Sequence, residues 1–137
     1  MRSFALSICL TFSLVACGGD DVPPPACTGS SCACEAGTAC DLGDSGCAGE
    51  SCTLTCPMDN TCTGACGGSC SATCAGGSRC DLTVGASGSV TCSGGSTCNI
   101  RCTDTCSLSC SSDSTCTLAC GDGAPTTITG SGTCAPG

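Results

Sequence analysis

Cysteine is the residue type in this sequence whose abundance and spacing could support chemistry. The 137 residues include 22 cysteines and no histidine. Cysteine thiolates bind metals, whereas an oxidising compartment joins thiols in disulfides. Histidine, lysine and tyrosine are all absent, so general bases are confined to carboxylates, and none is placed to activate a serine or threonine. We therefore expect a non-enzymatic protein with no cofactor and no small-molecule substrate.

The cysteines recur with an 18-residue period, most completely in Ser93–Cys110. That stretch holds two runs, Cys98–Cys102 and Cys106–Cys110, in which cysteine, an aliphatic residue and cysteine alternate with polar residues. Alternate residues of an extended chain share one face, so these runs predict strands with cysteine on the inner face. Helical periodicity is absent. We expect an all-β protein, a small disulfide-rich right-handed parallel β-solenoid with 18-residue coils.

The first residues are typical of an export signal. Arg2 supplies a positive charge, and Phe4–Ala16 is an apolar run too short to span a bilayer. We therefore expect a signal peptide at 1–16, a tether rich in proline at 17–26 and a Cys-rich β-solenoid domain at 27–137. Within that domain we expect an N-terminal cap at 27–38 and repeats at 39–134.

The segment Leu14-Val15-Ala16-Cys17 resembles the lipobox of bacterial lipoproteins, whose cysteine carries fatty acyl chains such as palmitate. The alternative is ordinary signal cleavage, which Leu14 fits poorly because that site favours small residues. Together with the repeat, the motif resembles the Cys-rich repeat lipoproteins of Gram-negative envelopes. This resemblance implies lipidation of Cys17, attachment to the membrane, and a structural or protein-interaction role in the cell envelope. Gly18 after Cys17 favours the outer membrane, facing the periplasm or the surface.

The net charge of the chain and the open ends of a solenoid indicate which kinds of partner to expect. The net charge is −8, and the only basic side chains after the signal are Arg79 and Arg101. Phosphate binding needs clustered basic residues, so we expect no nucleic acid. An open solenoid exposes strand edges at its first and last coils, so a protein partner or a second copy could bind there.

Two positions suggest the disulfide pattern. Val84 and Gly88 stand where neighbouring repeats have cysteines, as expected if those two cysteines pair with each other. Extending this rule, outer with outer and inner with inner inside each coil, predicts Cys40–Cys56, Cys47–Cys52, Cys62–Cys74, Cys66–Cys70, Cys80–Cys92, Cys98–Cys110 and Cys102–Cys106. Six cysteines have no predicted partner: Cys27, Cys32, Cys34, Cys116, Cys120 and Cys134.

One geometric objection leaves the pairing open. Stacked sheets lie about 10 Å apart, whereas a disulfide needs Cα atoms within roughly 7 Å. Either the coil is thin, or bonds run between coils, as in Cys80 to Cys98.

Two other functions remain possible on the sequence alone. A thiol-rich domain could sequester metal, although export favours disulfides over thiolates. The second possibility is ice binding, because Thr61-Cys62-Thr63 and Thr115-Cys116-Thr117 resemble the Thr-Cys-Thr face of insect antifreeze solenoids. Arg79, Asp81 and Asn99 interrupt that face in the intervening repeats.

Overall fold

The computed structural model describes residues 26–28, 31–34, 39–41 and 51–135, and all of its regular elements are β-strands. The strands are β1 Ala26–Thr28, β2 Ser31–Ala33, β3 Ala39–Asp41, β4 Thr53–Cys56, β5 Thr61–Cys66, β6 Ser71–Cys74, β7 Arg79–Val84, β8 Gly88–Cys92, β9 Thr97–Cys102, β10 Cys106–Cys110, β11 Thr115–Cys120, β12 Thr126–Ile128 and β13 Gly130–Cys134. In this part of the chain no helix could span a membrane. The expected signal peptide, Cys17 and most of the tether lie outside the described residues.

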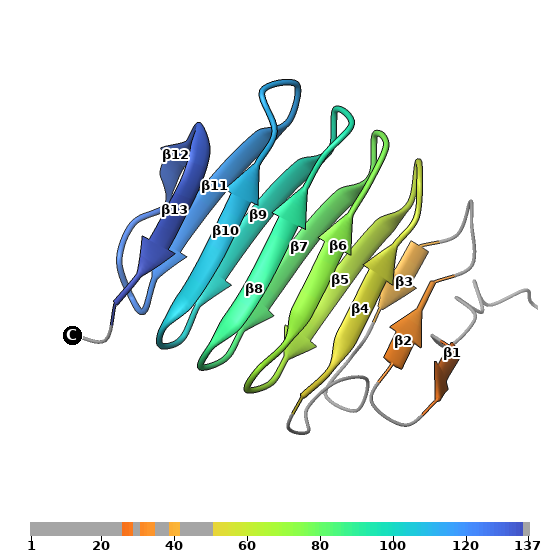
Figure 1. Cartoon of the computed structure of the whole chain (residues 1–137), viewed down its shortest axis with the longest axis horizontal. Helices are drawn as coiled ribbons and strands as arrows, with labels where there is room; N and C mark the ends of the chain where they lie inside the picture. Colours follow the sequence, from red (N-terminus) through yellow and green to blue (C-terminus); the bar gives the residue numbers. More distant parts are fainter. Residues whose placement is uncertain (1–25, 29–30, 35–38, 42–50, 136–137) are drawn as a thin grey trace, which may run out of the picture.

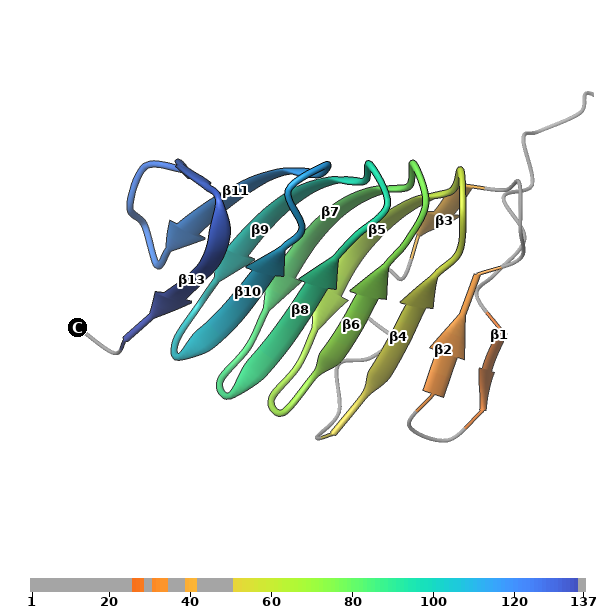
Figure 2. The same ribbon diagram turned by 45° about the horizontal axis from the view of Figure 1, so that its top comes forward.

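The strands form the two faces of a parallel β-solenoid (Figures 1 and 2). Sheet A has the strand order β1-β2-β4-β6-β8-β10-β13, and sheet B has the order β12-β11-β9-β7-β5-β3. Successive coils pair in parallel with an 18-residue offset, so that Cys62 aligns with Cys80 and Cys80 with Cys98. The sequence prediction of an all-β solenoid with 18-residue coils is thus confirmed.

Antiparallel strands end the stack. At the C-terminal end β12 pairs with β11 and β13 pairs with β10, both antiparallel. At the other end β1 pairs antiparallel with β2. The last coil therefore ends in one antiparallel strand on each sheet, β12 or β13, instead of two further parallel strands.

The core is a narrow column of aliphatic side chains between two rows of sulfur. Leu54, Ala72, Val90 and Leu108 follow one another down the inner face of sheet A, and all are buried. Opposite them, Leu82, Ile100 and Leu118 follow one another down sheet B and are also buried. The cysteines lie at the strand ends. The alternation read from Ser93–Cys110 therefore describes the inner and outer faces correctly.

The described disulfides bracket the turns. The pairs are Cys34–Cys40, Cys56–Cys62, Cys66–Cys70, Cys74–Cys80, Cys92–Cys98, Cys102–Cys106, Cys110–Cys116 and Cys120–Cys134. All but the last of these join the end of one strand to the start of the next strand. Their Cα atoms are 5.7 to 6.5 Å apart. The two sheets converge at each turn, so disulfides form there without thinning the whole coil.

Four predicted pairs are wrong for one reason. Cys40–Cys56, Cys62–Cys74, Cys80–Cys92 and Cys98–Cys110 were expected inside a coil, but each outer cysteine instead bonds across the turn into the neighbouring coil. The joint absence of cysteine at Val84 and Gly88 indicates only that the two inner cysteines of a coil pair with each other. It contains no information on the partners of the outer cysteines. The rival bond from Cys80 to Cys98 is also wrong, because Cys80 pairs with Cys74 and Cys98 with Cys92.

The inner pairs Cys66–Cys70 and Cys102–Cys106 are present as predicted. Cys52 is disulfide-bonded, but Cys47, its predicted partner, lies outside the described residues. Four cysteines left without a predicted partner, Cys34, Cys116, Cys120 and Cys134, now have one. Cys32 is disulfide-bonded as well. A spacing of six residues, repeated from Cys34–Cys40 to Cys110–Cys116, was the sequence signal for the outer pairs.

Non-reduced peptide mapping tests this pairing. Digestion at low pH, where thiols are protonated and exchange is slow, should yield a peptide joining Cys74 to Cys80. A peptide joining Cys80 to Cys92 would contradict the across-turn pattern. Counting free thiols in the same sample should give a value near zero, since oxidised cysteines are not available as thiolates.

The turn at Gly94 provides a second test. Gly94 has φ of +66°, and an added Cβ would lie 2.9 Å from the backbone nitrogen of Gly76 in the preceding coil. That nitrogen donates to the carbonyl of Ser93 at 3.1 Å, so it cannot easily move away. Gly95 also has positive φ, +76°, but its Cβ would meet nothing closer than 3.9 Å.

We expect Gly94→Ala to lower the free energy of unfolding by roughly 2–4 kcal/mol and Gly95→Ala by about 1 kcal/mol. Backbone strain affects both variants, whereas crowding between coils affects only the first. Guanidinium unfolding of the oxidised proteins, followed by circular dichroism, measures both values. Equal losses would show that the coils do not pack closely at this turn.

Candidate functional site

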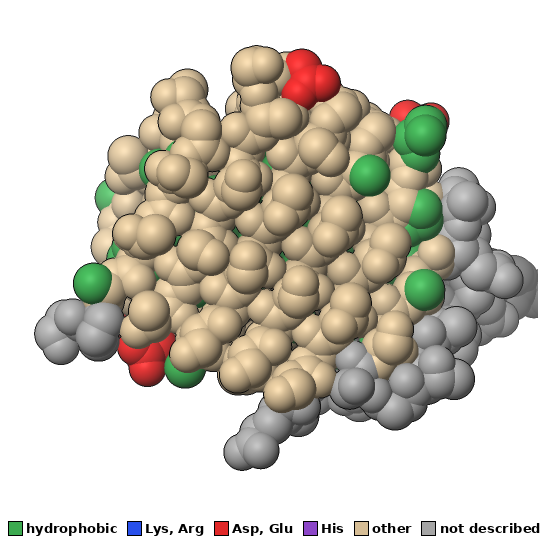
Figure 3. Space-filling view, viewed as in Figure 1, with side chains coloured by type: hydrophobic (Ala, Val, Ile, Leu, Met, Phe, Trp, Pro, Cys, Tyr) green, Lys and Arg blue, Asp and Glu red, His purple; other side chains and the backbone are tan. Residues whose placement is uncertain are grey.

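The outer face of sheet A is an array of hydroxyl groups, which we call the hydroxyl face. It consists of two neighbouring columns, Thr53, Ser71, Ser89, Ser107 and Thr133 in one and Thr55, Thr73, Thr91, Ser109 and Ser131 in the other. All of these residues are exposed except Ser107, which is half-buried. Figure 3 looks onto this face and shows acidic side chains only near its rim. The face is therefore polar but uncharged.

The spacing of the hydroxyl face follows from the sheet. Neighbouring strands lie about 4.8 Å apart, and alternate residues of one strand lie about 6.6 Å apart. The parallel register holds equivalent residues in line from β4 to β10. Disulfides hold both ends of β6 and β10 and the C-terminal end of β8, so the hydroxyl groups are held on a rigid support.

The outer face of sheet B is different, because it carries charged residues. Arg79 Nε donates to Asp81 Oδ2 at 3.0 Å. Asn99 Nδ2 donates to the other oxygen of Asp81, and Thr117 Oγ1 donates to Asn99 Oδ1 at 3.0 Å. These four side chains form a continuous hydrogen-bonded ladder across three strands.

The ladder explains why the Thr-Cys-Thr segments do not form a regular face. Thr61 and Thr63 lie on β5, whereas Thr115 and Thr117 lie on β11, with β7 and β9 between them. The intervening strands place Arg79, Asp81 and Asn99 in the same columns. The sequence already indicates that these residues interrupt a threonine array on this sheet, but the array on the other sheet was not predicted from it. In the sequence, the array on sheet A is indicated by the Ser or Thr that stands on both sides of Leu54, Ala72, Val90 and Leu108.

A shallow pocket of about 270 Å³ adjoins the ladder on sheet B. Asn99, Arg101 and Thr117 contribute to its floor, and Pro125 borders it. Arg101 Nη1 donates to the carbonyl oxygen of Gly121, which orients the guanidinium along the loop after β11. Asp81 also lines the pocket, which thus combines a carboxylate and a guanidinium with hydroxyl and amide groups.

Acidic side chains lie singly in several turns. The carboxylate of Asp113 accepts a hydrogen bond from Ser111 Oγ, and this bond, followed by its own backbone amide, lowers the pKa of Asp113 below its ordinary value. Asp104 Oδ1 accepts the backbone N–H of Thr105 at 2.7 Å. Hydrogen bonds of this kind stabilise turns, and neither residue needs a catalytic role to explain its position.

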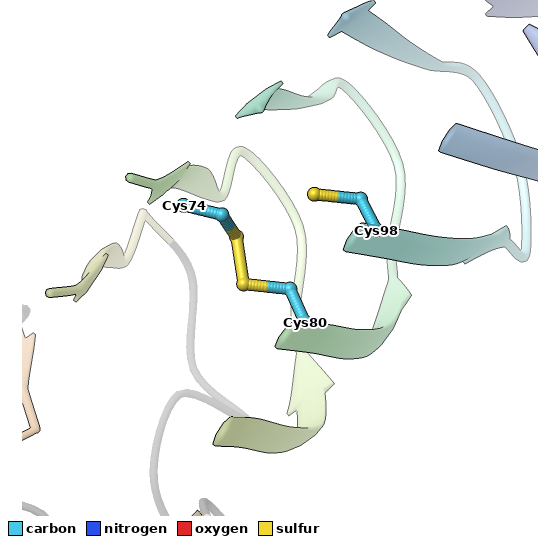
Figure 4. A group of neighbouring side chains, drawn as sticks. All are labelled: Cys74, Cys80 and Cys98. Atoms are coloured by element: carbon cyan, nitrogen blue, oxygen red, sulfur yellow. A yellow bond between two sulfur atoms is a disulfide. The ribbon is translucent and has the colours of Figure 1, made fainter. Parts of the chain in front are cut away.

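Buried cysteines from neighbouring coils bring their sulfurs together. The Sγ atoms of Cys74, Cys80 and Cys98 lie within 4.8 Å of one another (Figure 4). Those of Cys92, Cys98 and Cys116 do so as well. At the other edge, Cys102, Cys106 and Cys134 form a similar group. Three thiolates at such distances could hold a soft metal ion. Each of these sulfurs is in a disulfide, so metal sequestration would first require reduction.

Comparison with family models, with curated proteins and with solved structures finds no match for this chain. Its function must therefore be argued from its own surfaces and sulfur chemistry.

Proposed function

We propose that this protein is a non-enzymatic, lipid-anchored component of the cell envelope whose solenoid presents the hydroxyl face to a partner. The observation that carries the proposal is this uncharged Ser/Thr array in a protein of net charge −8. Its hydroxyl groups both donate and accept hydrogen bonds, so the face suits a neutral polar surface of a protein or of the envelope. The absence of charge allows close approach without desolvating ions.

The export and anchoring part of the proposal is supported by sequence alone. Leu14-Val15-Ala16-Cys17 would direct acylation of Cys17, and residues 17–26 would separate the membrane from the solenoid. The disulfides are consistent with folding in an oxidising compartment. The outer membrane is the favoured location because Gly18 follows Cys17. Partner binding or self-association at the ends of the solenoid remains a second mode of contact.

Substitution of the expected acylation site tests the anchor. In a Gram-negative host, Cys17→Ser should move the protein from the membrane fraction to the soluble fraction and remove the acyl mass from the N-terminal peptide. Cys9→Ser, within the signal, should leave both unchanged. Membrane attachment that survives Cys17→Ser would contradict lipidation at this residue.

Site-specific photo-crosslinking in intact envelopes tests the surface. A photoreactive residue at Thr91, in the centre of the hydroxyl face, should give a discrete crosslinked product that Thr73→Lys abolishes. The matched control places the same residue at Thr63 on sheet B, beside Asp41 and Asp81, where no such product is expected. Equal crosslinking from both positions, or none from Thr91, would count against the hydroxyl face as the contact surface.

Ice binding is a second candidate, favoured by the regular spacing of the same face. Hydroxyl groups repeated along two axes can order water in a matching array, and the exposed charges of sheet B are absent from sheet A. Thermal hysteresis should then appear in the oxidised protein and be lost in Thr91→Lys but kept in Thr63→Lys. A solution without hysteresis would eliminate this candidate and leave the partner proposal intact.

A further inference from the structure

The disulfide Cys120–Cys134 differs from the other described disulfides in position. It closes the C-terminal segment that contains β12 and β13, and its cysteines are 14 residues apart. Cys120 is exposed, whereas every other cysteine of described burial is buried. Cys120 is exposed because it is the last residue of β11, at the end of the stack. No parallel strand pairs with β11 on its outer side, and the chain turns away directly after Cys120, at Gly121–Gly123.

The other half of this disulfide is buried beside a second one. Cys134 is only 2% exposed. Antiparallel pairing of β10 with β13 places it opposite Cys106, which is bonded to Cys102. The Sγ atoms of these three residues lie within 4.8 Å of one another. A thiolate formed at Cys134 would therefore arise directly beside the Cys102–Cys106 bond.

We propose that these four cysteines form a thiol–disulfide exchange site, entered at Cys120 by an external dithiol, such as a small dithiol or a dithiol protein. A thiolate of the dithiol attacks Cys120 Sγ, the bond to Cys134 breaks, and the electron pair leaves on Cys134 Sγ. The second thiol of the reagent then attacks the mixed disulfide, releasing Cys120 as a thiolate and the reagent as its disulfide. Two electrons thus pass from the dithiol to the protein.

The next step is internal and changes no oxidation state overall. The Cys134 thiolate attacks Cys106 Sγ, a Cys106–Cys134 bond forms, the Cys102–Cys106 bond breaks, and Cys102 leaves as the thiolate. The register favours attack on Cys106, because that residue lies directly opposite Cys134. Reducing equivalents entering at the surface thereby reach a buried cysteine of β9. This inference does not depend on the function proposed for the hydroxyl face.

The other close groups of sulfur lack an entrance. Cys74, Cys80 and Cys98 are all buried, as are Cys92 and Cys116. An external thiolate cannot reach these sulfurs while the coil is intact. Exchange should therefore begin at the C-terminal end of the described stack.

Two variants separate the proposed exchange from simple loss of a disulfide. Cys120→Ser leaves Cys134 as a thiol within 4.8 Å of both Cys102 and Cys106, whereas Cys134→Ser leaves Cys120, the strand neighbour of Cys102, as a thiol that is not part of this close group. After incubation at pH 8, acid quenching and peptide mapping, we expect Cys120→Ser to show Cys106–Cys134 as its main new disulfide, with Cys102 alkylated. The control should keep Cys102–Cys106, with Cys120 alkylated. Retention of Cys102–Cys106 in both variants would overturn the proposal.

Limited reduction of the unsubstituted protein gives a test that does not depend on how the variants fold. Dithiothreitol at low concentration, followed by quenching and alkylation, should label Cys120 and Cys102 first and leave a Cys106–Cys134 peptide. Labelling of Cys120 and Cys134 together, with Cys102–Cys106 intact, would show reduction without exchange. Earlier labelling of a buried pair such as Cys74–Cys80 would show that Cys120 is not the entrance. Either result would refute the inference.

Discussion

The structure depends on the convergence of its two sheets at every turn. Side chains separate stacked sheets by about 10 Å in the middle of a layer, too far for a disulfide. Where the chain passes from one sheet to the other, the Cα atoms of flanking cysteines lie 5.7 to 6.5 Å apart. Disulfides therefore form at the edges and aliphatic residues fill the middle. A chain without aromatic residues after Phe12 can thus close a core from small side chains.

This arrangement removes the need for a large apolar core. Each turn-bracketing disulfide restricts only a short loop, but the bonds recur at both edges of the stack, so that the unfolded chain loses freedom along much of its length. Sulfurs of adjacent coils also touch, as between Cys34 and Cys62, whose Sγ atoms lie 3.3 Å apart. Stability is consequently spread along the solenoid, and the outer faces are left free of packing constraints.

Much of this fold could be predicted from the sequence, because the solenoid repeats a short pattern. Period-2 alternation around Ile100 and Leu108 identified the inner face, and the 18-residue offset identified the register. The outer disulfides could not be obtained from the same argument. Cys62, Cys74 and Cys80 lie at the same edge of the stack, so the sequence pattern allows Cys74 to pair with either of the other two. Only the direction in which the chain advances from one coil to the next decides which cysteine becomes its partner. That direction is a property of the three-dimensional path, and the pattern of missing cysteines does not contain it.

The two faces show how function can be placed on such a scaffold. Both sheets have the same core and the same spacing, yet Arg79, Asp81 and Asn99 lie on sheet B, whereas β4, β6, β8, β10 and β13 of sheet A present hydroxyl groups on their outer face. Thr favours exposed strand positions and Asp is depleted there. Sheet B nevertheless accommodates Arg79, Asp81 and Asn99 at equivalent positions, so strand packing alone does not require the difference. Turns at the rim of sheet A do carry acids, such as Asp113. Among the residues that the structure describes, acids border the hydroxyl face but do not lie on it, and the contact that we propose for this face would account for that distribution.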